Sequence, residues 1–498
     1  MSFLLKQQHP LFDHFQLEFS SVAIETPAAY SGLTAFHKYW GKKPIELIQF
    51  LLQHLTQPND IVVDPFLGGG LVTRCSRELN RRFIGIDVNP VSLELGKFFV
   101  SLPRYNEYAD AYHEIASSVR PIIEESYGTK QGEVASHYLW ECNSLKQVWI
   151  TGKKNKRELT PTNFDQQQIN RFEKYFPKKL RNAVFFDNSR INSLSHFKWS
   201  DLFTLRALRN IELLLNSFER YPESLRRALR LTLTSNMGQM SKMVFAISQR
   251  GKASGRKHTS RSLEVGSWAI GFWRPPLHFE INVWNCFSLR AERLLKILKR
   301  TDDQYVPVEK TVQSFFSKKA PIALIEGSCL DVLPKIPDDS VSLIITDPPH
   351  GDRMPYLELS ELWNAVLSDQ IPNFDTEIVV SNAKERKKNT DSFCKDMETF
   401  MNYCFRIMDP NNGFLALMFN AKETKTWDFL LKDSRLAYLG CFPQKYSTGS
   451  IVQDNRKGAM REDFVLIFSK TDKPDKKRFA EFPGWDNRLP TEIMEGKQ

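Results

Sequence analysis

Residues 342–356, SLIITDPPHGDRMPY, place chemically active side chains at the end of a predicted buried strand. Apolar and β-branched residues run into Asp347, which is followed by Pro348, Pro349 and His350. Proline has no N–H to give to a sheet, so the strand has to end at this point. A carboxylate, a rigid bend and a planar ring are therefore presented together at a strand tip. Taken alone, the motif also fits a rigid turn that merely ends the strand.

A second group lies in residues 61–70, IVVDPFLGGG, where a short apolar run meets an acid and then a glycine loop. Glycines let the backbone approach a ligand closely, and a helix that follows them offers free N–H groups. Further along, FIGIDVNP ends a second apolar run in Asp87. An acid at the end of a second strand suits the hydroxyls of a ribose. The loop is not GxGxxG, but its context predicts a nucleoside cofactor.

The elements that must position these groups alternate between strand and helix. Apolar runs and helical periodicity predict a helix from Pro44, strands at 61–63 and 83–87, and a helix between the two strands. After residue 320 the same alternation returns, with strands at 322–325, 342–346, 414–419, 436–446 and 464–468 and a helix at 393–408. Such βαβ order indicates an α/β fold with a parallel sheet covered by helices. The sheet is therefore predicted to be split in sequence by a large insertion.

The insertion carries the positive charge of the chain. Residues 101–320 hold 36 Lys and Arg against 21 Asp and Glu, whereas the rest of the 498-residue chain has a net charge of −5. Amphipathic patterns at 202–218 and 222–233 predict that the insertion is mostly helical. A basic segment between neutral flanks favours a polyanion partner, most simply nucleic acid. The alternative is a solvated surface that happens to be rich in lysine.

Within the insertion, residues 249–261, QRGKASGRKHTSR, have no apolar face. One interpretation is a flexible arm that contacts phosphates, and the other is a surface loop without such a role. The candidate nucleic-acid-binding residues of this arm are Arg250, Lys252, Arg256, Lys257 and Arg261.

The remaining composition excludes several classes of protein. No apolar run approaches the roughly 18 residues that a membrane span needs, and the N-terminal residues make a poor signal peptide. The seven cysteines form no CxxC pair and no Cys/His cluster with zinc spacing. We therefore predict a cytoplasmic protein without membrane association or a structural metal.

Together the two motifs resemble the S-adenosylmethionine-dependent amino-methyltransferases that act on DNA. DPFLGGG resembles the cofactor loop of that family, and TDPPH resembles its Asp-Pro-Pro-Tyr catalytic motif. HKYWGKKPIELIQFLL is similar to the helix motif that accompanies the loop, and EGSCLDVLPKIPDDSVSLIITDPP is similar to the stretch that leads into the catalytic motif. RIMDPNNGFLALMFN and REDFVLIFSK resemble the strands after it. The resemblance covers roughly residues 30–100 and 320–470, with the cofactor loop first and the catalytic motif last.

The resemblance implies a Rossmann-like methyltransferase sheet with S-adenosylmethionine as the cofactor and double-stranded DNA as the partner. The cofactor-binding residues that it implies are His37, Lys43, Asp64, Pro65, Phe66, Gly68, Gly70, Asp87, Asn89 and Ser328. At the catalytic motif, Asp347 and the Pro348 carbonyl would each accept an N–H of an exocyclic amine, which concentrates its lone pair toward a methyl group. The planar side chain of His350 would stack on a base flipped out of the duplex.

The sequence departs from the family pattern at two positions. His350 replaces the usual tyrosine, and Ser328 stands where the family often has an aspartate near the adenine of the cofactor. The order of motifs implies that the insertion recognises the target. The predicted domains are therefore the first half of a methyltransferase domain (1–100), a target-recognition domain (101–320), the second half of the methyltransferase domain (321–471) and a tail (472–498).

Adenine N6 is the favoured target, because Asp at the head of the motif is typical of adenine enzymes, and cytosine N4 remains open. A tRNA guanine-N2 methyltransferase is the first alternative, since it shares the motif order and Gly351 follows the motif here. A cofactor-binding DNA protein without activity is the second. A hydride-transferring dehydrogenase would leave TDPPH unexplained. A partner from a restriction or defence system is compatible with the family.

Overall fold

The chain divides into two compact units in the computed structural model. The first comprises Met1–Leu102, Asp302–Ser360 and Pro372–Gln498, and the second comprises Pro103–Thr301 and Glu361–Ile371. The structure describes residues 30–152, 156–247, 263–268, 270–301, 303–351, 354–421, 424–431, 435–445, 462–471 and 479–495.

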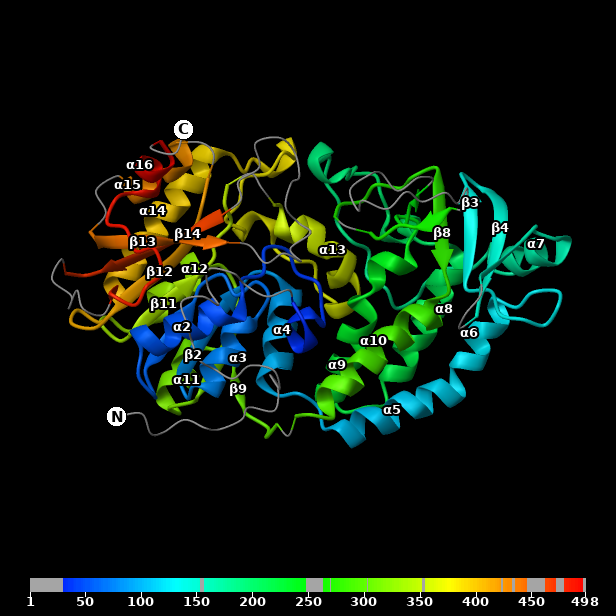
Figure 1. Ribbon diagram of the computed structural model, residues 1–498, viewed down its shortest axis with the longest axis horizontal. Helices are drawn as coiled ribbons and strands as arrows, with labels where there is room; N and C mark the ends of the chain where they lie inside the picture. The colour runs from blue at the N-terminus through cyan, green and yellow to red at the C-terminus, as the bar shows by residue number, and fades with distance from the viewer. Residues whose placement is uncertain are drawn as a thin grey trace. The chain divides into compact units, whose positions relative to one another are not determined.

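The first unit is built on an eight-stranded sheet (Figure 1). Its strand order is β13-β14-β12-β11-β1-β2-β10-β9. The strands are β1 (Ile61–Asp64), β2 (Arg82–Asp87), β9 (Val308–Glu309), β10 (Ile322–Glu326), β11 (Leu343–Thr346), β12 (Phe414–Phe419), β13 (Ala437–Lys445) and β14 (Glu462–Ser469). Strand β14 pairs antiparallel with both its neighbours, and the other pairs of named strands in this sheet are parallel. The predicted α/β fold is confirmed.

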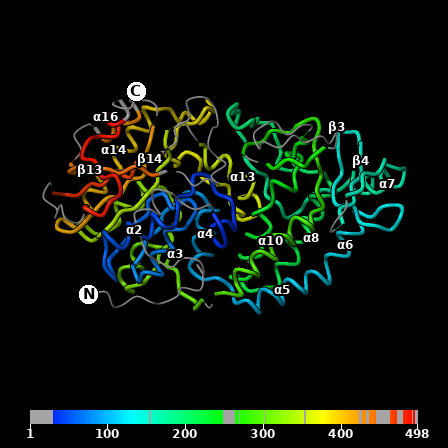
Figure 2. The backbone as a smooth tube through the Cα atoms, viewed as in Figure 1, coloured from blue at the N-terminus to red at the C-terminus, as the bar shows by residue number. Residues whose placement is uncertain are grey.

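Strands from the two halves of the sequence meet at the centre of this sheet. Val62 of β1 pairs with Leu343 of β11 on one side and with Phe83 of β2 on the other. Figure 2 shows the blue N-terminal part of the tube running among the yellow and orange C-terminal parts. The sheet is thus split in sequence, as predicted. Connections leave β1 in one direction and β11 in the other, and ligands of open α/β sheets bind at such a switch point.

Helices cover both faces of the sheet. On one face lie α2 (Ile45–Leu55), α3 (Leu71–Glu78) and α4 (Pro90–Val100), where a Cβ on Gly96 would meet Leu324 of β10. Side chains alternate along a strand, so the residues before and after Leu324 in β10 point to the opposite face of the sheet. There they form one core with α11 (Val312–Ser317), α12 (Cys329–Val332) and α14 (Thr390–Ile407).

The second unit combines helices with a sheet that the sequence did not predict. Its helices are α5 (Tyr105–Ser118), α6 (Arg120–Ser126), α7 (Asn163–Asn170), α8 (Leu205–Phe218), α9 (Glu223–Thr234) and α10 (Val283–Leu298). A four-stranded antiparallel sheet has the order β5-β4-β3-β8, formed by Lys156–Leu159, Ser144–Thr151, His137–Glu141 and Leu277–Ile281. "Mostly helical" was therefore incomplete, because polar residues such as those of KREL in β5 hide the strand pattern. The arm at 249–261, with its five candidate basic residues, lies outside the described residues.

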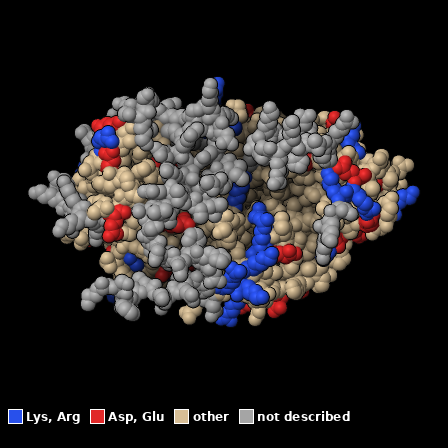
Figure 3. All heavy atoms as spheres, in the orientation of Figure 1, with Lys and Arg blue, Asp and Glu red and all other residues tan. Residues whose placement is uncertain are grey.

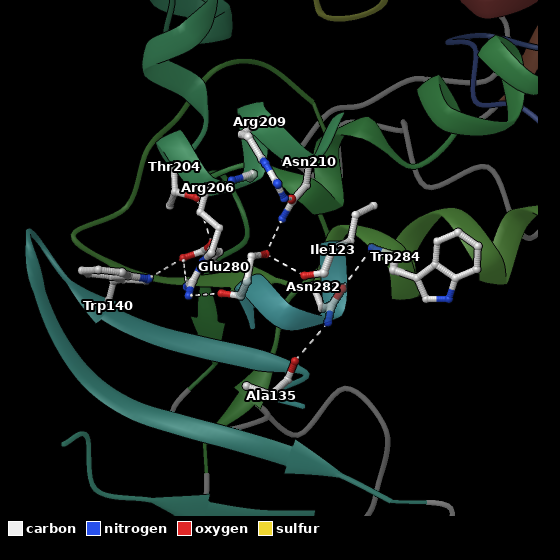
Figure 4. A network of polar contacts seen from close by, with 12 residues as sticks. Ile123, Ala135, Trp140, Thr204, Arg206, Arg209, Asn210, Glu280, Asn282 and Trp284 are labelled. Carbon is white, nitrogen blue, oxygen red and sulfur yellow. Dashed lines mark hydrogen bonds and ion pairs between the residues drawn. The ribbon is translucent and has the colours of Figure 1, made fainter. Parts of the chain in front are cut away.

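A buried ion pair joins the helices and the sheet of the second unit (Figure 4). The Nε and Nη2 atoms of Arg206 each lie 2.9 Å from a carboxylate oxygen of Glu280. Thr204 and the indole N–H of Trp140 also donate to Glu280. Burial alone would raise the pKa of Glu280, but Arg206 beside it holds this pKa below its ordinary value. The pair thus ties α8 to β8 and β3.

The segment 472–498, predicted to be a tail, packs on the first unit over its described part. Phe479 and Phe482 are buried, and the Phe482 ring lies 4.9 Å from that of Phe50 in α2. A helix, α16 (Pro490–Glu495), follows. The prediction was wrong here because three aromatic residues, the third being Trp485, supply apolar area within an otherwise charged stretch.

No group of three or more His, Cys, Asp or Glu side chains in the described chain is placed to hold a metal ion. Within the same residues, none of the helices combines the length and the apolar character required to cross a bilayer.

Candidate active site

Asp347 follows β11 directly and is held by two basic side chains. The nitrogen of Lys43 lies 3.1 Å from Asp347 Oδ1, and Nε2 of His350 lies 2.9 Å from the same oxygen. Lys43 also donates to Asp463 at the start of β14, over 2.7 Å. Lys43 and Asp463 are both buried. A buried lysine shared by two carboxylates is a strong electrostatic clamp, because burial weakens the screening by water.

The second oxygen of Asp347 lies near Gly41, and both residues line one pocket. Among the described residues no hydrogen bond reaches Asp347 Oδ2, since the closest contacts of this side chain all go to Oδ1. A Cβ built on Gly41 would lie 4.0 Å from Oδ2 and 3.4 Å from the hydroxyl of Tyr356. Asp347 Oδ2 and the Tyr356 hydroxyl thus both lie near Gly41 in the pocket wall. Oδ2 is placed to accept a hydrogen bond from a ligand.

His350 acts on Asp347 in this structure. Its Nε2 faces both Asp347 Oδ1 and the carbonyl of Met418, at 2.9 and 3.2 Å. Because both are acceptors, Nε2 carries the hydrogen and donates it. The ring packs edge-on against Phe419, 5.2 Å between centroids. Ring stacking of His350 on a base stays a prediction.

The glycine loop and Asp87 form the other side of the site. The N–H of Gly68 donates to Asp87 Oδ2 over 2.8 Å, and the N–H of Asn89 donates to Oδ1 over 2.8 Å. Asn89 in turn donates to Ser360. These bonds fix the Asp87 carboxylate at the end of β2. The adjacent strand β1 ends in Asp64. Asp64 Oδ1 accepts from Thr346 of β11 over 2.8 Å, which ties the two motifs together.

One pocket of the first unit joins both motifs. It encloses about 930 Å³ of empty space, counting open solvent at its mouth. Of the residues predicted from the sequence, it is lined by Lys43, Asp64, Pro65, Phe66, Gly68, Gly70, Asp87, Asn89, Ser328, Asp347 and Pro349. Residues about 280 positions apart in sequence thus share one cavity, as the switch point of the sheet requires.

Three predicted residues do not line this pocket: His37, Pro348 and His350. His37 is buried, and its ring contacts the Lys38 carbonyl at 2.7 Å. Sequence reasoning in turn missed Tyr356, whose ring lines the pocket and stacks on Tyr39 with centroids 6.0 Å apart.

Asp463 was missed as well. The signal available for it was an acid at the start of the otherwise apolar run FVLIF, since a buried acid in such a strand needs a partner. No comparable signal marked Tyr356, because which aromatic reaches the pocket depends on the start of α13 (Tyr356–Leu367).

The buried acids of the site have raised pKa values. Burial raises the pKa of Asp64 to about 7, against the hydrogen bond from Thr346, and the charges of Asp87 and Asp347 raise it further. Burial raises the pKa of Asp87 to about 6, although the N–H groups of Gly68 and Asn89 oppose the shift. A carboxyl that is harder to ionise in the folded state stabilises the fold at low pH and loses that contribution as pH rises through its folded pKa.

We therefore expect the free energy of unfolding to depend on pH through Asp64. Its contribution falls from about pH 4 to about pH 7, by at most about 1.4 kcal/mol per pH unit. Asp64→Asn removes this slope, so the variant gains stability relative to the wild type as pH rises. Urea unfolding at pH 5, 6, 7 and 8 measures the difference. Glu326→Gln, at an exposed carboxyl, is the control, and equal slopes for all three proteins would contradict the prediction.

A second prediction concerns Gly70, which is the N-cap of α3 and has φ +74°. A Cβ there would lie 3.0 Å from the backbone nitrogen of Gly96 in α4. Gly70→Ala is expected to cost about 1–3 kcal/mol of stability and to weaken binding of the S-adenosylmethionine that the sequence predicts as cofactor. Gly32→Ala is the matched control, since it also has positive φ (+50°) but open space around it. Thermal unfolding and calorimetric titration test both variants, and equal losses would show that crowding against Gly96 has no part.

Comparisons with known proteins match part of the chain. The sequence model of a DNA methylase family of the N6/N4 type matches residues 9–98. The type II methyltransferase M.HindIII of Haemophilus influenzae is 42% identical over 48 residues, which are 10% of this chain and 16% of that protein. M2.LlaDCHI of Lactococcus lactis subsp. cremoris, also a type II methyltransferase, is 34% identical over 64 residues, 12% of this chain and 24% of the relative.

A further relative, the type II methyltransferase M1.MboII of Moraxella bovis, is 34% identical over 59 residues, 12% of this chain and 23% of its own length. The chain thus spans about a sixth to a quarter of the length of the curated relatives it matches. The family match includes the glycine loop and Asp87. The part of the chain that carries the cofactor loop and Asp87 is therefore similar to DNA methylases of the N6/N4 type.

Proposed function

We propose that this protein transfers a methyl group from S-adenosylmethionine to an exocyclic amine of a flipped DNA base, with adenine N6 as the preferred target. The proposal rests mainly on the contacts of the two carboxylate oxygens of Asp347. Lys43 and His350 both engage its Oδ1, which leaves Oδ2, near the pocket-lining Gly41, as the oxygen that can accept from a ligand. An amine donor is the ligand that such an oxygen suits.

The residues present fit S-adenosylmethionine. The pocket is lined by the glycines of the loop and by Asp87 at the end of β2, and side chains larger than glycine at Gly69 and Gly70 would crowd Lys42 and Gly96. Asp87 would hold the ribose hydroxyls, and the glycine loop would take the methionine end. When bound, this cofactor supplies an electrophilic methyl group on sulfur.

The side chains around Asp347 have distinct roles in this proposal. Lys43 forms an ion pair with the carboxylate, and His350 fixes its rotation by donating to Oδ1. Oδ2 accepts one N–H of the target amine and orients its lone pair. The proton that the nitrogen loses on methylation can leave through the same oxygen. Tyr356, whose hydroxyl flanks Oδ2, is placed to contact the base, a role predicted for His350 from the family pattern.

The basic insertion at 101–320 is proposed to bind the DNA, as the charge of the sequence and the order of the motifs support. The type II relatives favour a modification role beside a restriction nuclease. Cytosine N4 has the same amine chemistry and remains the first alternative base. A tRNA guanine-N2 target would need the insertion to bind RNA.

The test is transfer of labelled methyl from S-adenosylmethionine to duplex DNA and, in parallel, to tRNA, with digestion to nucleosides. We expect label in DNA as N6-methyladenine. Label as N4-methylcytosine would correct the base, and label in tRNA alone would overturn the DNA assignment. Cofactor binding with no transfer to either nucleic acid would identify a binding protein without activity.

A further inference from the structure

Helix α10 of the second unit carries a line of positive charge on its outer face. The helix and the two residues after it contain five basic residues and one acid, Glu292. The basic residues, which we name the α10 basic stripe, are Arg290, Arg293, Lys296, Lys299 and Arg300. The opposite face is apolar and buried, with Phe287, Ala291 and Leu294 in the core. Arg293, Lys296, Lys299 and Arg300 are exposed, whereas Arg290 is half-buried at the edge of the apolar face.

The stripe differs from the neighbouring helix in the pairing of its charges. On α9, Arg230 pairs with Glu219 at 2.7 Å and Arg227 pairs with Glu223 at 2.6 Å. Among the described residues none of the five side chains of the stripe forms an ion pair with an acid. Figure 3 shows Lys and Arg side chains gathered over the region where Figure 1 draws α9 and α10.

Unpaired like charges on one helix cost stability. Side chains three or four residues apart are neighbours on a helix, and equal charges there repel. Burial and the neighbouring charge of Arg293 both lower the pKa of Arg290. The helix dipole rewards cations in the last turn, which accounts for Lys296, Lys299 and Arg300. It does not account for Arg290 and Arg293, which precede that turn.

We propose that the α10 basic stripe binds successive phosphates of the duplex DNA substrate. The inference rests on the proposed function for its partner, and the charge of the stripe is complementary to that partner. Arg293, Lys296 and Arg300 are spaced three and four residues apart and lie along one line. At about 1.5 Å per residue this line spans about 10.5 Å, and one strand of DNA advances about 3.4 Å per phosphate along the axis. The stripe thus reaches about three phosphates.

The test uses the full-length triple variant Arg293→Gln, Lys296→Gln, Arg300→Gln and a fluorescent duplex. Affinity is measured by anisotropy between 50 and 200 mM NaCl. Each phosphate contact contributes about 0.9 to the slope of log K against log salt, so we expect the slope to fall by about 2 to 3. We expect the affinity at 100 mM NaCl to fall at least tenfold.

The triple variant Arg226→Gln, Arg227→Gln, Arg230→Gln on α9 is the matched control. It removes the same charge from arginines that pair with acids, and we expect its affinity to stay within about twofold of the wild type. The thermal midpoint and calorimetric binding of S-adenosylmethionine establish that both variants are folded. A stripe variant with the wild-type slope would overturn the inference, as would equal losses in both variants.

Failure of the stripe and failure of the proposed function can be told apart. DNA binding by the wild type with the expected drop in slope, but no methyl transfer, would retain the stripe and reject the enzyme. Methyl transfer to DNA by the wild type, with unchanged DNA binding by the stripe variant, would retain the proposed enzyme and reject the stripe. A wild type that binds duplex RNA but not duplex DNA would overturn the partner assigned to the stripe.

Discussion

Asp347→Ala is expected to lower the rate constant of methyl transfer by about 10²–10³-fold, the loss typical of removing one preorganised hydrogen-bonding group from an active site. The variant loses the acceptor at Oδ2 and leaves Lys43 with Asp463 as its remaining carboxylate partner among the described residues. Cofactor affinity should change far less, because Asp87 and the glycine loop lie on the other side of the pocket. Single-turnover transfer of labelled methyl and calorimetric titration of the cofactor measure the two quantities separately.

Asp347→Asn is the informative companion. An amide keeps one acceptor oxygen but loses the charge that engages Lys43, so an intermediate rate is expected. Asp463→Asn serves as a control for the clamp, since it removes a charge from Lys43 without touching the reacting amine. Wild-type rates in Asp347→Ala would reject the assigned role. Equal losses in Asp347→Ala and Asp463→Asn would assign the effect to the clamp instead of the acceptor.

The second large effect is expected on stability, from the buried pair Arg206 and Glu280 (Figure 4). The Arg206 guanidinium also lies over the rings of Tyr127 and Tyr138, 4.6 and 4.0 Å from their centroids. Glu280→Gln leaves this cation buried without its carboxylate and is expected to destabilise the protein by about 3–5 kcal/mol. Urea unfolding followed by circular dichroism measures the loss.

The double variant Arg206→Met, Glu280→Leu removes both charges at similar volume. It should recover a large part of the stability, because the cost of a broken pair is mainly that of the charge left behind. The exposed pair Arg120 and Glu124, four residues apart on α6, is the matched control, at about 0.3–0.5 kcal/mol. A small loss in Glu280→Gln, similar to that in Glu124→Gln, would contradict the argument.

The sequence alone identified the glycine loop, the motif around Asp347 and the class of fold. Residues 61–70 and 342–350 carry local signals, since apolar runs that stop at an acid and a glycine or proline mark strand tips. Asp87 was found in the same way. Two sets of parallel strands imply a common edge, so both motifs could be expected at one edge of one sheet before the structure was known.

The tertiary structure decided which side chains surround Asp347. Lys43, Asp463 and Tyr356 come from a loop, a strand and a helix, and their positions around Asp347 depend on strand register and on where the helices begin. The local periodicity of the sequence predicts neither the strand register nor the position at which a helix begins. The antiparallel sheet of the second unit was missed for a related reason, because β-strand preference depends on the face and the neighbours of a residue.

Local patterns thus identified the acids, the glycines and the strands that end in them, because these depend on backbone conformation within a few residues. The clamp on Asp347, the orientation of its Oδ2 and the pairing of Arg206 with Glu280 join residues far apart in the chain. Such contacts arise only when packed elements bring their side chains together, and only the folded molecule shows them.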